Sequence, residues 1–319
     1  MAITDFGRRA DGRAVGVATL QAGALSARIL THGAVLQDLR LAGIDRSLTL
    51  GSDRIADYEG PMRFHGSLVG PVANRIAGAQ ATIAGRTFRF QAGDHGVTLH
   101  SGDTGLHLAL WDVAQVTADS LTLAIDLPDG LGGFPGNRRI TAQWQVIPPA
   151  TLRLTLRMTT DAPTLANIAN HSYWNLDGTE GWAGHALRIA ADRWLPSTPE
   201  NLPTGQIADV AGTAMDFRTM RPITPGAPPL DTCFCLSDAR APLRDVLWLR
   251  GASGVTMTVA TTEPGIQVFD ARTARRPGHS PFEGLAIEPQ FWPDAPGNPA
   301  FPSIVLLPGQ PWEQVSEWR

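Results

Sequence analysis

The sequence predicts an all-β protein, folded as a large antiparallel β-sandwich or barrel. Apolar and polar residues alternate with a period of two in several segments, as they do in strands that bury one face. The 33 glycines and 25 prolines interrupt the chain so often that no helical periodicity persists for long. Many short strands bounded by Gly, Pro and Asp turns favour a sandwich or barrel over βαβ units.

The clearest strands follow one another along the chain. Residues 83–90 (IAGRTFRF) predict one arm of a hairpin that turns at Gly85. Apolar side chains take every second position in Leu121–Leu127, Leu152–Met158 and Val255–Val259. In the second of these segments arginine and threonine take the alternate positions, so we expect one buried face and one that meets water.

Residues 1–319 are expected to form a single domain. The most turn-rich segment, residues 221–229 (RPITPGAPP), could be a linker. Alternating patterns continue on both sides of it, however, which favours a long surface loop within one unit. No internal repeat or low-complexity tract divides the chain, and all-β domains of this size occur as single units.

Composition and charge restrict the class of partner. The chain is 43% hydrophobic and 18% charged with a formal net charge of −4, and no run of basic residues is longer than two. Nucleic acids and anionic membranes both select for clustered positive charge, so neither is expected as a partner.

The N-terminus and the cysteines bear on location. The start of the chain lacks a charged segment followed by an apolar core, and no apolar run is long enough to span a membrane, so a cytoplasmic protein is expected. Cys233 and Cys235 are too few for a structural zinc site. We expect them to be buried apolar residues without a mutual disulfide.

Polar groups are concentrated in a few segments at predicted strands or strand ends. The densest is Asn167–Leu176, which indicates a wall of a polar-ligand pocket, although a half-buried histidine at a strand end is an equal alternative. Glu288 follows three apolar residues, where an ionised group is costly unless it is paired or at a wet site. The other segments are Gly70–Ile76 with Asn74 and Arg75, Leu99–Gly102 with His100, and Leu230–Leu236 with Asp231.

Together these segments resemble one family, the aldose 1-epimerases, also called galactose mutarotases. Its signature has the form Asn-x-Thr-Asn-His-x-Tyr-Phe/Trp-Asn-Leu, and residues 167–176 (NIANHSYWNL) match it except at Ala169. Further matches keep the family's order from about Gly70 to Pro308, in Val72–Ile76, Leu99–His100, Gly133–Gly136, Pro203–Gly205, Thr261–Gln267, Glu288–Gln290 and Pro293–Pro296.

The resemblance implies a galactose mutarotase-like β-supersandwich and an isomerase that interconverts the α and β anomers of a free aldose. It implies that His171 is the general acid that protonates the ring oxygen, and that Glu288 is the general base for the C1 hydroxyl. The implied sugar-binding residues are Asn74, Arg75, His100, Tyr173, Asp231 and Gln267. The expected partner is a small-molecule monosaccharide, with no metal or organic cofactor, and the chain is expected to be a monomer or homodimer.

The reaction needs one proton taken and one given, so we expect the carboxylate and the imidazole on opposite sides of the sugar ring. A nearby carboxylate should raise the pKa of His171 from about 6.5 towards neutral pH. The sequence departs from the family pattern at Pro71, Ala169, Ser101 and the loop Asp129–Gly133. These departures leave the preferred aldose open, whether a hexose, a pentose or a uronic acid.

Other interpretations remain open on the sequence alone. His95, His100 and His107 could be taken for metal ligands, although their spacing fits no compact zinc pattern. Glu263 could be the second carboxylate of a glycosidase, or it could shape the turn that presents Gln267. A non-catalytic sugar-binding protein does not need an acid–base pair. A sugar-phosphate epimerase should have several converging basic groups, and only Arg75 is obviously placed for that.

Two smaller expectations concern aromatic and imidazole side chains. Trp174 and Trp292 adjoin proposed site residues and could stack on a sugar. His65, His185 and His279 are expected at the surface or in loops.

Overall fold

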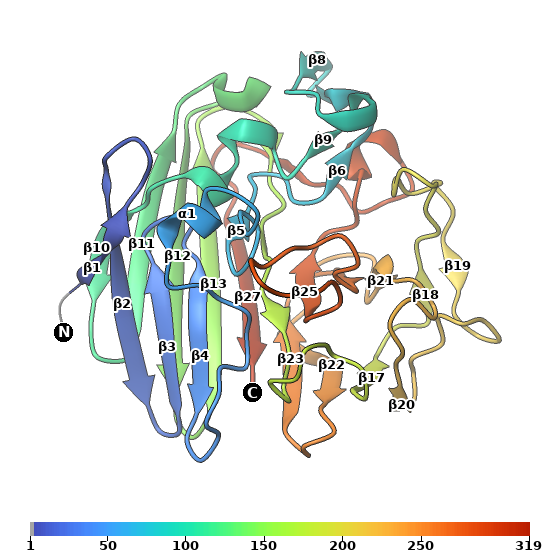
Figure 1. Ribbon diagram of the computed structural model, residues 1–319. Helices are drawn as coiled ribbons and strands as arrows, with labels where there is room; N and C mark the ends of the chain where they lie inside the picture. Colours follow the sequence, from blue (N-terminus) through green and yellow to red (C-terminus); the bar gives the residue numbers. More distant parts are fainter. Residues whose placement is uncertain (1–2) are drawn as a thin grey trace.

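The computed structural model describes residues 3–319, and these residues are arranged mainly as strands in two layers (Figure 1). One layer is a single antiparallel nine-stranded sheet. In spatial order it contains β10 (Asp112–Val116), β11 (Ser120–Leu127), β12 (Arg138–Ile147), β13 (Thr151–Thr160), β27 (Trp312–Trp318), β23 (Thr256–Thr261), β22 (Arg244–Arg250), β17 (Ala186–Ile189) and β20 (Arg221–Pro222).

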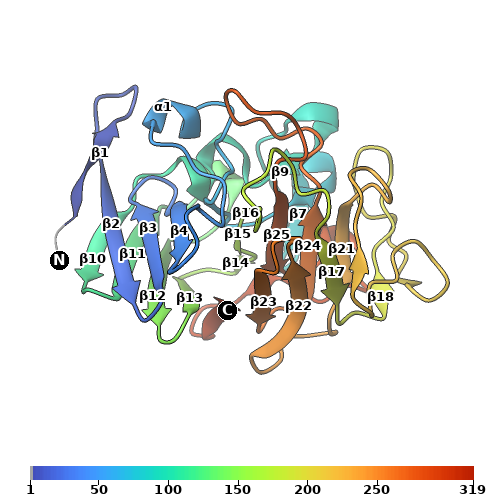
Figure 2. The same ribbon diagram turned by 60° about the horizontal axis from the view of Figure 1, so that its bottom comes forward.

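The facing layer consists of two sheets that lie side by side (Figure 2). A four-stranded sheet packs on β11–β13 and contains β1 (Thr4–Arg8), β2 (Ala14–Ala22), β3 (Leu25–Leu30) and β4 (Leu36–Leu41). A six-stranded sheet lies over β22 and β23, with the order β16 (Tyr173–Trp174), β25 (Leu285–Gln290), β24 (Gly265–Phe269), β21 (Asp231–Cys235), β18 (Arg193–Trp194) and β19 (Ala208–Asp209).

Four pairs of short strands complete the fold among residues 3–319. They are β5 (Leu68–Val69) with β15 (Ala169–Asn170), β6 (Arg75–Ile76) with β9 (Thr98–Leu99), β7 (Gln80–Ile83) with β8 (Arg86–Arg89), and β14 (Thr164–Leu165) with β26 (Val305–Leu306). The one α-helix in residues 3–319 is the short α1 (Ile55–Tyr58).

The strands predicted from period-two patterns are confirmed. β7 and β8 form the hairpin that turns at Gly85, whose φ of 80° lies in the left-handed region that glycine adopts without strain. In β13 the alternate residues Leu152, Leu154 and Met158 are buried, because they face the four-stranded sheet across the core.

A continuous apolar core lies between the two layers and joins residues of both smaller sheets to the nine-stranded sheet. β25 is buried along its whole length, which holds the backbone that carries Glu288 rigidly in place. Cys233 and Cys235 are free and buried, as expected. No helix among residues 3–319 has the length and apolar composition needed to cross a membrane.

Candidate active site

A cavity of about 660 Å³ opens over one end of the six-stranded sheet and collects most of the predicted site residues. Its lining includes Asn74, Arg75, His100, His171, Tyr173, Asp231 and Glu288. The remaining predicted residue, Gln267, lies in a small adjoining cavity that shares Asn74 and Asp231 with the first. Sequence segments separated by more than two hundred residues therefore meet at one place.

Strand register brings the site side chains together. Gln267 of β24 is directly opposite Glu288 of β25, and Tyr173 of β16 is opposite Ala286. Ala286 and Glu288 are two residues apart in one strand and so face the same side of the sheet, which brings Tyr173 near the carboxyl group. β21 begins with Asp231 and pairs with β24 on its other edge. The extended backbone of these strands thus sets the arrangement of the site.

His171 and Glu288 are adjacent to each other. Nε2 of His171 is 3.5 Å from Oε1 of Glu288, and both residues are buried, with 5% and 2% of their surfaces exposed. The two groups therefore lie on the same wall of the cavity, not on opposite sides of a ring as expected from the reaction alone. This placement is chemically sufficient, since the ring oxygen and the C1 hydroxyl oxygen of an aldose are bonded to the same carbon.

Burial sets the protonation of this pair. It lowers the pKa of His171 to about 4, so the expected rise caused by a nearby carboxylate is wrong. Burial also raises the pKa of Glu288 well above its ordinary value, and the neighbouring Asp231 raises it further. Between these two pKa values the pair holds one proton, which rests on Glu288 in the free protein.

Asn74 and His100 hold each other in an unusual backbone conformation. Their φ values of 63° and 51° are left-handed, a region that non-glycine residues rarely adopt. The backbone N–H of Asn74 donates to Nδ1 of His100 at 3.0 Å, and the backbone N–H of His100 donates to the carbonyl of Asn74 at 2.9 Å. Because Nδ1 accepts, the proton of the neutral ring is on Nε2. Burial lowers the pKa of His100 well below its ordinary value, so the ring is a neutral donor.

The turn beside His100 shows why Ser101 is compatible with the fold. Ser101 has a φ of 66°, and its hydroxyl accepts from the N–H of Val72 and donates to the carbonyl of the same residue. These two hydrogen bonds link the His100 turn to the segment that carries Asn74. The serine thus takes a structural role at this position.

Asp231 is held from two sides. Nε2 of Gln267 donates to Oδ1 of Asp231 at 2.6 Å, and the guanidinium of Arg75 lies 3.6 Å from Oδ2. Burial raises the pKa of Asp231, while Arg75 and Gln267 oppose that rise. The carboxyl group is therefore oriented before any ligand binds.

The cavity also contains residues that the sequence did not indicate. Phe269 is two residues after Gln267 in β24 and therefore on the same side of the sheet, so the period of the strand could have identified it. The ring of Phe64 lies 5.8 Å from that of His171 and 4.8 Å from that of His100. Phe64 belongs to an irregular segment and has no pattern that could have revealed it. Arginines at the cavity mouth were missed as well: Arg63, Arg272 and Arg275.

Two histidines expected at the surface or in loops, His65 and His185, do lie in loops, but both are buried. His65 is 3% exposed, and its ring stacks on that of Tyr173 with centroids 4.2 Å apart. His185 is fully buried, and its Nε2 accepts from the backbone N–H of Leu176. His279 is exposed, as predicted. Tertiary packing thus covers His65 and His185 although neither belongs to a helix or strand.

The expected stacking of tryptophans on a ligand is also wrong. Trp174 is fully buried and stacks on Trp318 within the core, with centroids 5.8 Å apart. The indole N–H of Trp292 donates to the carbonyl of Pro264 at 3.0 Å. Neither lines the cavity. Trp174 points into the core between the two layers, and Trp292 packs against Phe301 in a separate apolar cluster. The aromatic side chains at the cavity are instead Phe64, Tyr173 and Phe269.

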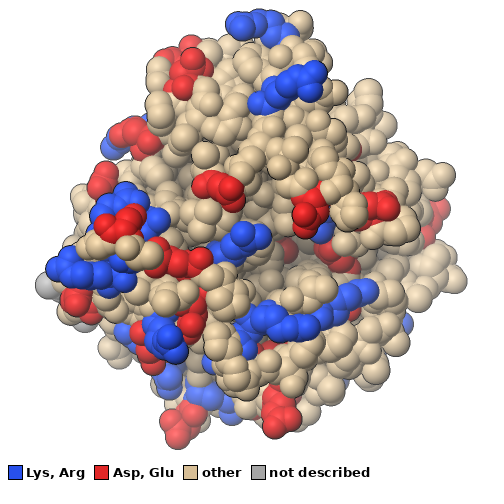
Figure 3. Space-filling model, turned by 45° about the horizontal axis from the view of Figure 1, so that its top comes forward, with Lys and Arg blue, Asp and Glu red and all other residues tan. Residues whose placement is uncertain are grey.

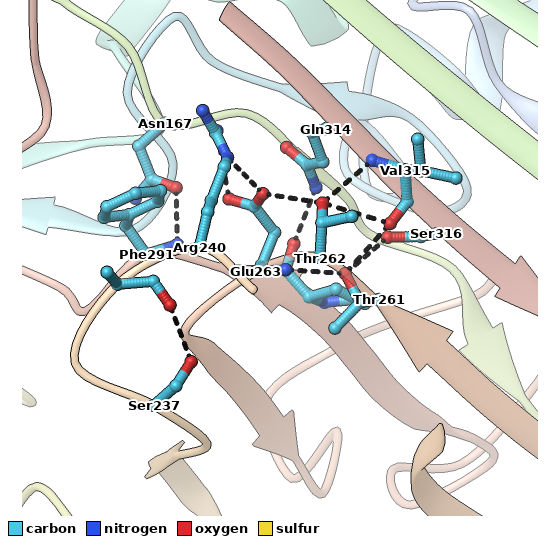
Figure 4. Close-up of polar contacts among 12 residues, drawn as sticks. Asn167, Ser237, Arg240, Thr261, Thr262, Glu263, Phe291, Gln314, Val315 and Ser316 are labelled. Carbon is cyan, nitrogen blue, oxygen red and sulfur yellow. Dashed lines mark hydrogen bonds and ion pairs between the residues drawn. The ribbon is translucent and has the colours of Figure 1, made fainter. Parts of the chain in front are cut away.

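Glu263 lies outside the cavity, in the polar network drawn in Figure 4. It is fully buried, and its carboxylate accepts from Nε of Arg240 at 2.7 Å. Its backbone N–H donates to the hydroxyl of Thr261. Glu263 therefore supports the turn before β24, which agrees with the interpretation that it shapes the turn presenting Gln267. It does not face Glu288 as a glycosidase carboxylate would.

The three histidines considered as metal ligands do not form one cluster. His100 and His107 each pack against Phe64, while His95 lies on an exposed turn beside the cavity. Across the described part of the chain, no group of three or more His, Cys, Asp or Glu side chains has metal-binding geometry.

Comparison with known proteins agrees with this geometry. The sequence model of the aldose 1-epimerase family matches residues 16–319. The chain is 31% identical to a galactose mutarotase from Mus musculus, covering 94% of this chain and 92% of the other, and 29% identical to an aldose 1-epimerase from Escherichia coli, covering 97% and 96%. A crystal structure of an aldose epimerase homologue from C. elegans superposes with a TM-score of 0.88 at 27% identity, covering 95% and 98% of the two chains. The fold, the order of the polar segments and these matches together show that the chain belongs to the aldose 1-epimerase family.

Proposed function

We propose that this protein interconverts the α and β anomers of a free aldose, with His171 and Glu288 as the acid–base pair. Ring opening takes the proton from the C1 hydroxyl and delivers one to the ring oxygen. Rotation about C1–C2 and closure on the other carbonyl face then reverse both transfers. A pair that holds one proton in total can carry out every step, so the chain itself supplies what the chemistry needs.

Unpaired buried atoms in the site are the observation that carries this proposal. Oε2 of Glu288, Nδ1 of His171 and Oε1 of Gln267 are buried, and none forms a hydrogen bond within residues 3–319. Leaving a buried polar atom without a partner costs roughly 1–3 kcal/mol, which a ligand that bonds to the atom can offset. Two of these atoms belong to the acid–base pair, which supports a polar ligand that engages Glu288 and His171. Sugar binding alone does not require an acid–base pair.

Substrate binding explains how the resting proton moves. A C1 hydroxyl that donates to Glu288 favours the ionised carboxylate, and a ring oxygen that accepts from His171 favours the protonated imidazole. The 3.5 Å separation allows the proton to pass from Glu288 to His171 as the sugar binds. In this state His171 is the general acid and Glu288 the general base.

The other predicted residues suit a positioning role around the ring. We propose that Asp231 and Arg75 bind hydroxyl groups, as an acceptor and a fork of donors, and that Asn74 and Nε2–H of His100 add further polar contacts. Gln267 orients Asp231. Burial raises the pKa of Tyr173 well above its ordinary value, so its phenol remains a donor. The ring of Phe269 offers a face for the apolar C–H groups of a sugar.

The proposal also covers the type of substrate, the cofactor requirement and the cellular compartment. The substrate is a small monosaccharide, the site works without a bound cofactor, and the two free cysteines suit a reducing compartment such as the cytoplasm. The assembly state as a monomer or homodimer stays a prediction.

Polarimetry tests the activity directly. Freshly dissolved α-glucose or α-galactose should reach its equilibrium rotation faster with catalytic amounts of the protein than in buffer alone. A heat-denatured sample is the control. No acceleration with any hexose, pentose or uronic acid would overturn the proposed function.

A further inference from the structure

The imidazole of His171 has few hydrogen bonds to hold it in place. Nδ1 forms none within residues 3–319, and Nε2 approaches Oε1 of Glu288 at 3.5 Å. The orientation of a functional histidine is often fixed by a hydrogen bond from Nδ1 to a carbonyl or carboxylate. Other contacts must therefore keep this ring directed at Glu288 and at the sugar.

Three rings pack against this imidazole. The centroid of the Phe64 ring is 5.8 Å from that of His171, and the two planes are nearly parallel, with an angle of 21° between them. The rings of Tyr173 and His100 are 5.1 Å and 5.3 Å away and are tilted by 31° and 76°. Tyr173 and His100 also carry polar groups that suit sugar binding. Phe64 has no polar atom in its side chain, so it contributes to the site by packing alone.

Protein groups already surround much of the Phe64 ring. The ring centroids of His100 and His107 are each 4.8 Å from that of Phe64, and the guanidinium carbon of Arg63 lies over the ring at 4.8 Å. The side chain also packs against a small apolar cluster, Val69, Ala73 and Ala169. Only part of Phe64 remains exposed. These contacts favour a role towards His171 over stacking on a sugar.

The backbone fixes the position of Phe64 relative to His171. The N–H of Gly66 donates to the carbonyl of His171 at 3.0 Å, and the N–H of His171 donates to the carbonyl of Ser67 at 2.9 Å. Gly66 has a φ of 70°, and a Cβ at this position would lie 2.3 Å from the carbonyl oxygen of Leu36, so the turn requires glycine here. Two backbone hydrogen bonds thus join the turn that carries Phe64 to the segment that carries His171.

The cavity is open to solvent, so the cover over the imidazole affects its protonation. The lining includes the exposed residues Arg63, Pro199 and Arg275. Figure 3 shows the molecule hollowed on one face, with acidic and basic side chains around the hollow. His171 is nevertheless only 5% exposed, and burial is the main cause of its low pKa. A ring that packs nearly parallel to the imidazole keeps water from part of its surface.

We propose that Phe64 is a positioning residue of the acid–base pair: its ring keeps the imidazole of His171 directed at Glu288 and shields it from water. This inference rests on the proposed function and adds a residue to its site. Phe64 carries no charge and takes no part in the proton transfers. Replacing it therefore changes the orientation and hydration of His171 without changing any charge among the titratable groups around that residue. These groups are Glu288, Tyr173, His65, His100 and His107.

Phe64→Leu tests the proposal, because it removes the ring and keeps an apolar side chain. Anomer exchange of glucose and galactose is measured by NMR from the exchange of magnetisation between the anomeric protons. We expect kcat to fall about tenfold or more while KM changes less than about threefold, since a misdirected imidazole transfers its proton poorly. The acidic limb of the pH profile should move up from about pH 4 to about pH 5 or above, since water reaches the imidazole. Phe64→Met should behave in the same way, and Phe64→Tyr, which keeps the ring, should restore both kcat and the limb.

Phe88→Leu is the matched control. Phe88 of β8 is partly buried, has the guanidinium of Arg86 over its ring at 5.3 Å, and does not line the cavity. Its replacement should change neither kcat nor the acidic limb. An NMR titration of His171 in the free Phe64→Leu protein, shown to be folded by circular dichroism, should give a raised pKa without any substrate present.

The outcomes separate this inference from the proposed function. If Phe64→Leu raises KM and leaves kcat and the acidic limb unchanged, Phe64 is a stacking surface for the sugar and the inference is wrong. An unchanged titration of His171 in that variant would overturn the inference as well. In both cases the mutarotase activity of the unsubstituted protein stands. If the unsubstituted protein accelerates no aldose, the proposed function fails and the inference fails with it.

Discussion

At the scale of single residues, the acid–base pair is tuned by burial more than by mutual attraction. Burial disfavours the charged form of each group, so it lowers the pKa of His171 and raises that of Glu288. At pH values between the two pKa values, this order favours the proton on the carboxyl group, 3.5 Å from the imidazole. The order of the two pKa values is thus the reverse of that in model peptides.

The reversed order predicts the acidic side of the pH profile. Below a pH of about 4, His171 takes up a second proton, the pair has no base, and kcat/KM falls. At high pH the pair loses its only proton as Glu288 ionises, and kcat/KM falls again. Activity should therefore be retained well below pH 6.5 and decline only near pH 4.

An NMR titration of the His171 imidazole in the free protein checks the cause, with His171→Gln used to assign the signal. The imidazole should stay neutral down to about pH 4. Protonation near its ordinary pKa of about 6.5 would contradict the account.

At the scale of elements, β24 and β25 carry Gln267 and Glu288 of the site. A buried polar network around Glu263 supports the turn that leads into β24 (Figure 4). Glu263 begins the turn into β24 and pairs with Arg240, whose guanidinium also lies over the rings of Phe291 and Trp312. The backbone N–H of Phe291, just after β25, donates to the side chain of Asn167. The network ties the two strands to the segment that carries His171.

Arg240→Met should lower the free energy of unfolding by roughly 3–5 kcal/mol, because it leaves the fully buried Glu263 carboxylate without its partner. Urea denaturation measures this loss. Arg139→Met removes an exposed ion pair with Asp126 and should cost less than about 1 kcal/mol. Equal losses in the two variants would mean that the buried pair does not stabilise the fold. Arg240→Met protein that remains folded should keep most of its activity although its stability falls, since neither Arg240 nor Glu263 lines the cavity.

The same strands show what the sequence could predict. Alternation is a local property, so it located β7, β8, β11, β13 and β23. Register between distant strands is not local, so the sequence alone could not show that Gln267 opposes Glu288 or that Asp231 accepts from Gln267. Those residues were assigned to one site through the resemblance of their segments to a family.

Burial was the other property that the sequence did not reveal. The burial of His65 and Trp174 was not predicted, because side-chain burial depends on which elements pack together. The direction of the His171 pKa shift was wrong for the same reason. Arg63, Arg272 and Arg275 at the cavity mouth were not predicted, because irregular segments have no periodicity that places a side chain.

At the scale of the whole molecule, we propose that residues 1–319 form one domain. The C-terminal strand β27 lies between β13 and β23 in the nine-stranded sheet, so it joins the half facing β1–β4 to the half facing the six-stranded sheet. The apolar core includes residues from both halves and from β27 itself. Neither half could keep its sheet intact if the other unfolded.

Calorimetry should therefore show a single unfolding transition with equal calorimetric and van't Hoff enthalpies. A chain that lacks residues 312–319 should fail to fold in either half, as judged by near-UV circular dichroism. Two separate transitions would show that the halves are independent units.

The central claim is that the imidazole of His171 and the carboxyl group of Glu288 share one proton. They exchange protons with the ring oxygen and the C1 hydroxyl of an aldose. Its most direct test is the rate of anomer exchange with His171→Gln and Glu288→Gln, beside His279→Gln and Glu313→Gln as exposed controls of the same chemistry. Each proton-transfer group accounts for roughly 10²–10⁴ in rate, so each site variant should lose at least about a hundredfold in kcat while still binding sugar and remaining folded. The controls should match the unsubstituted protein. Turnover of either site variant within about tenfold of that protein would contradict the claim.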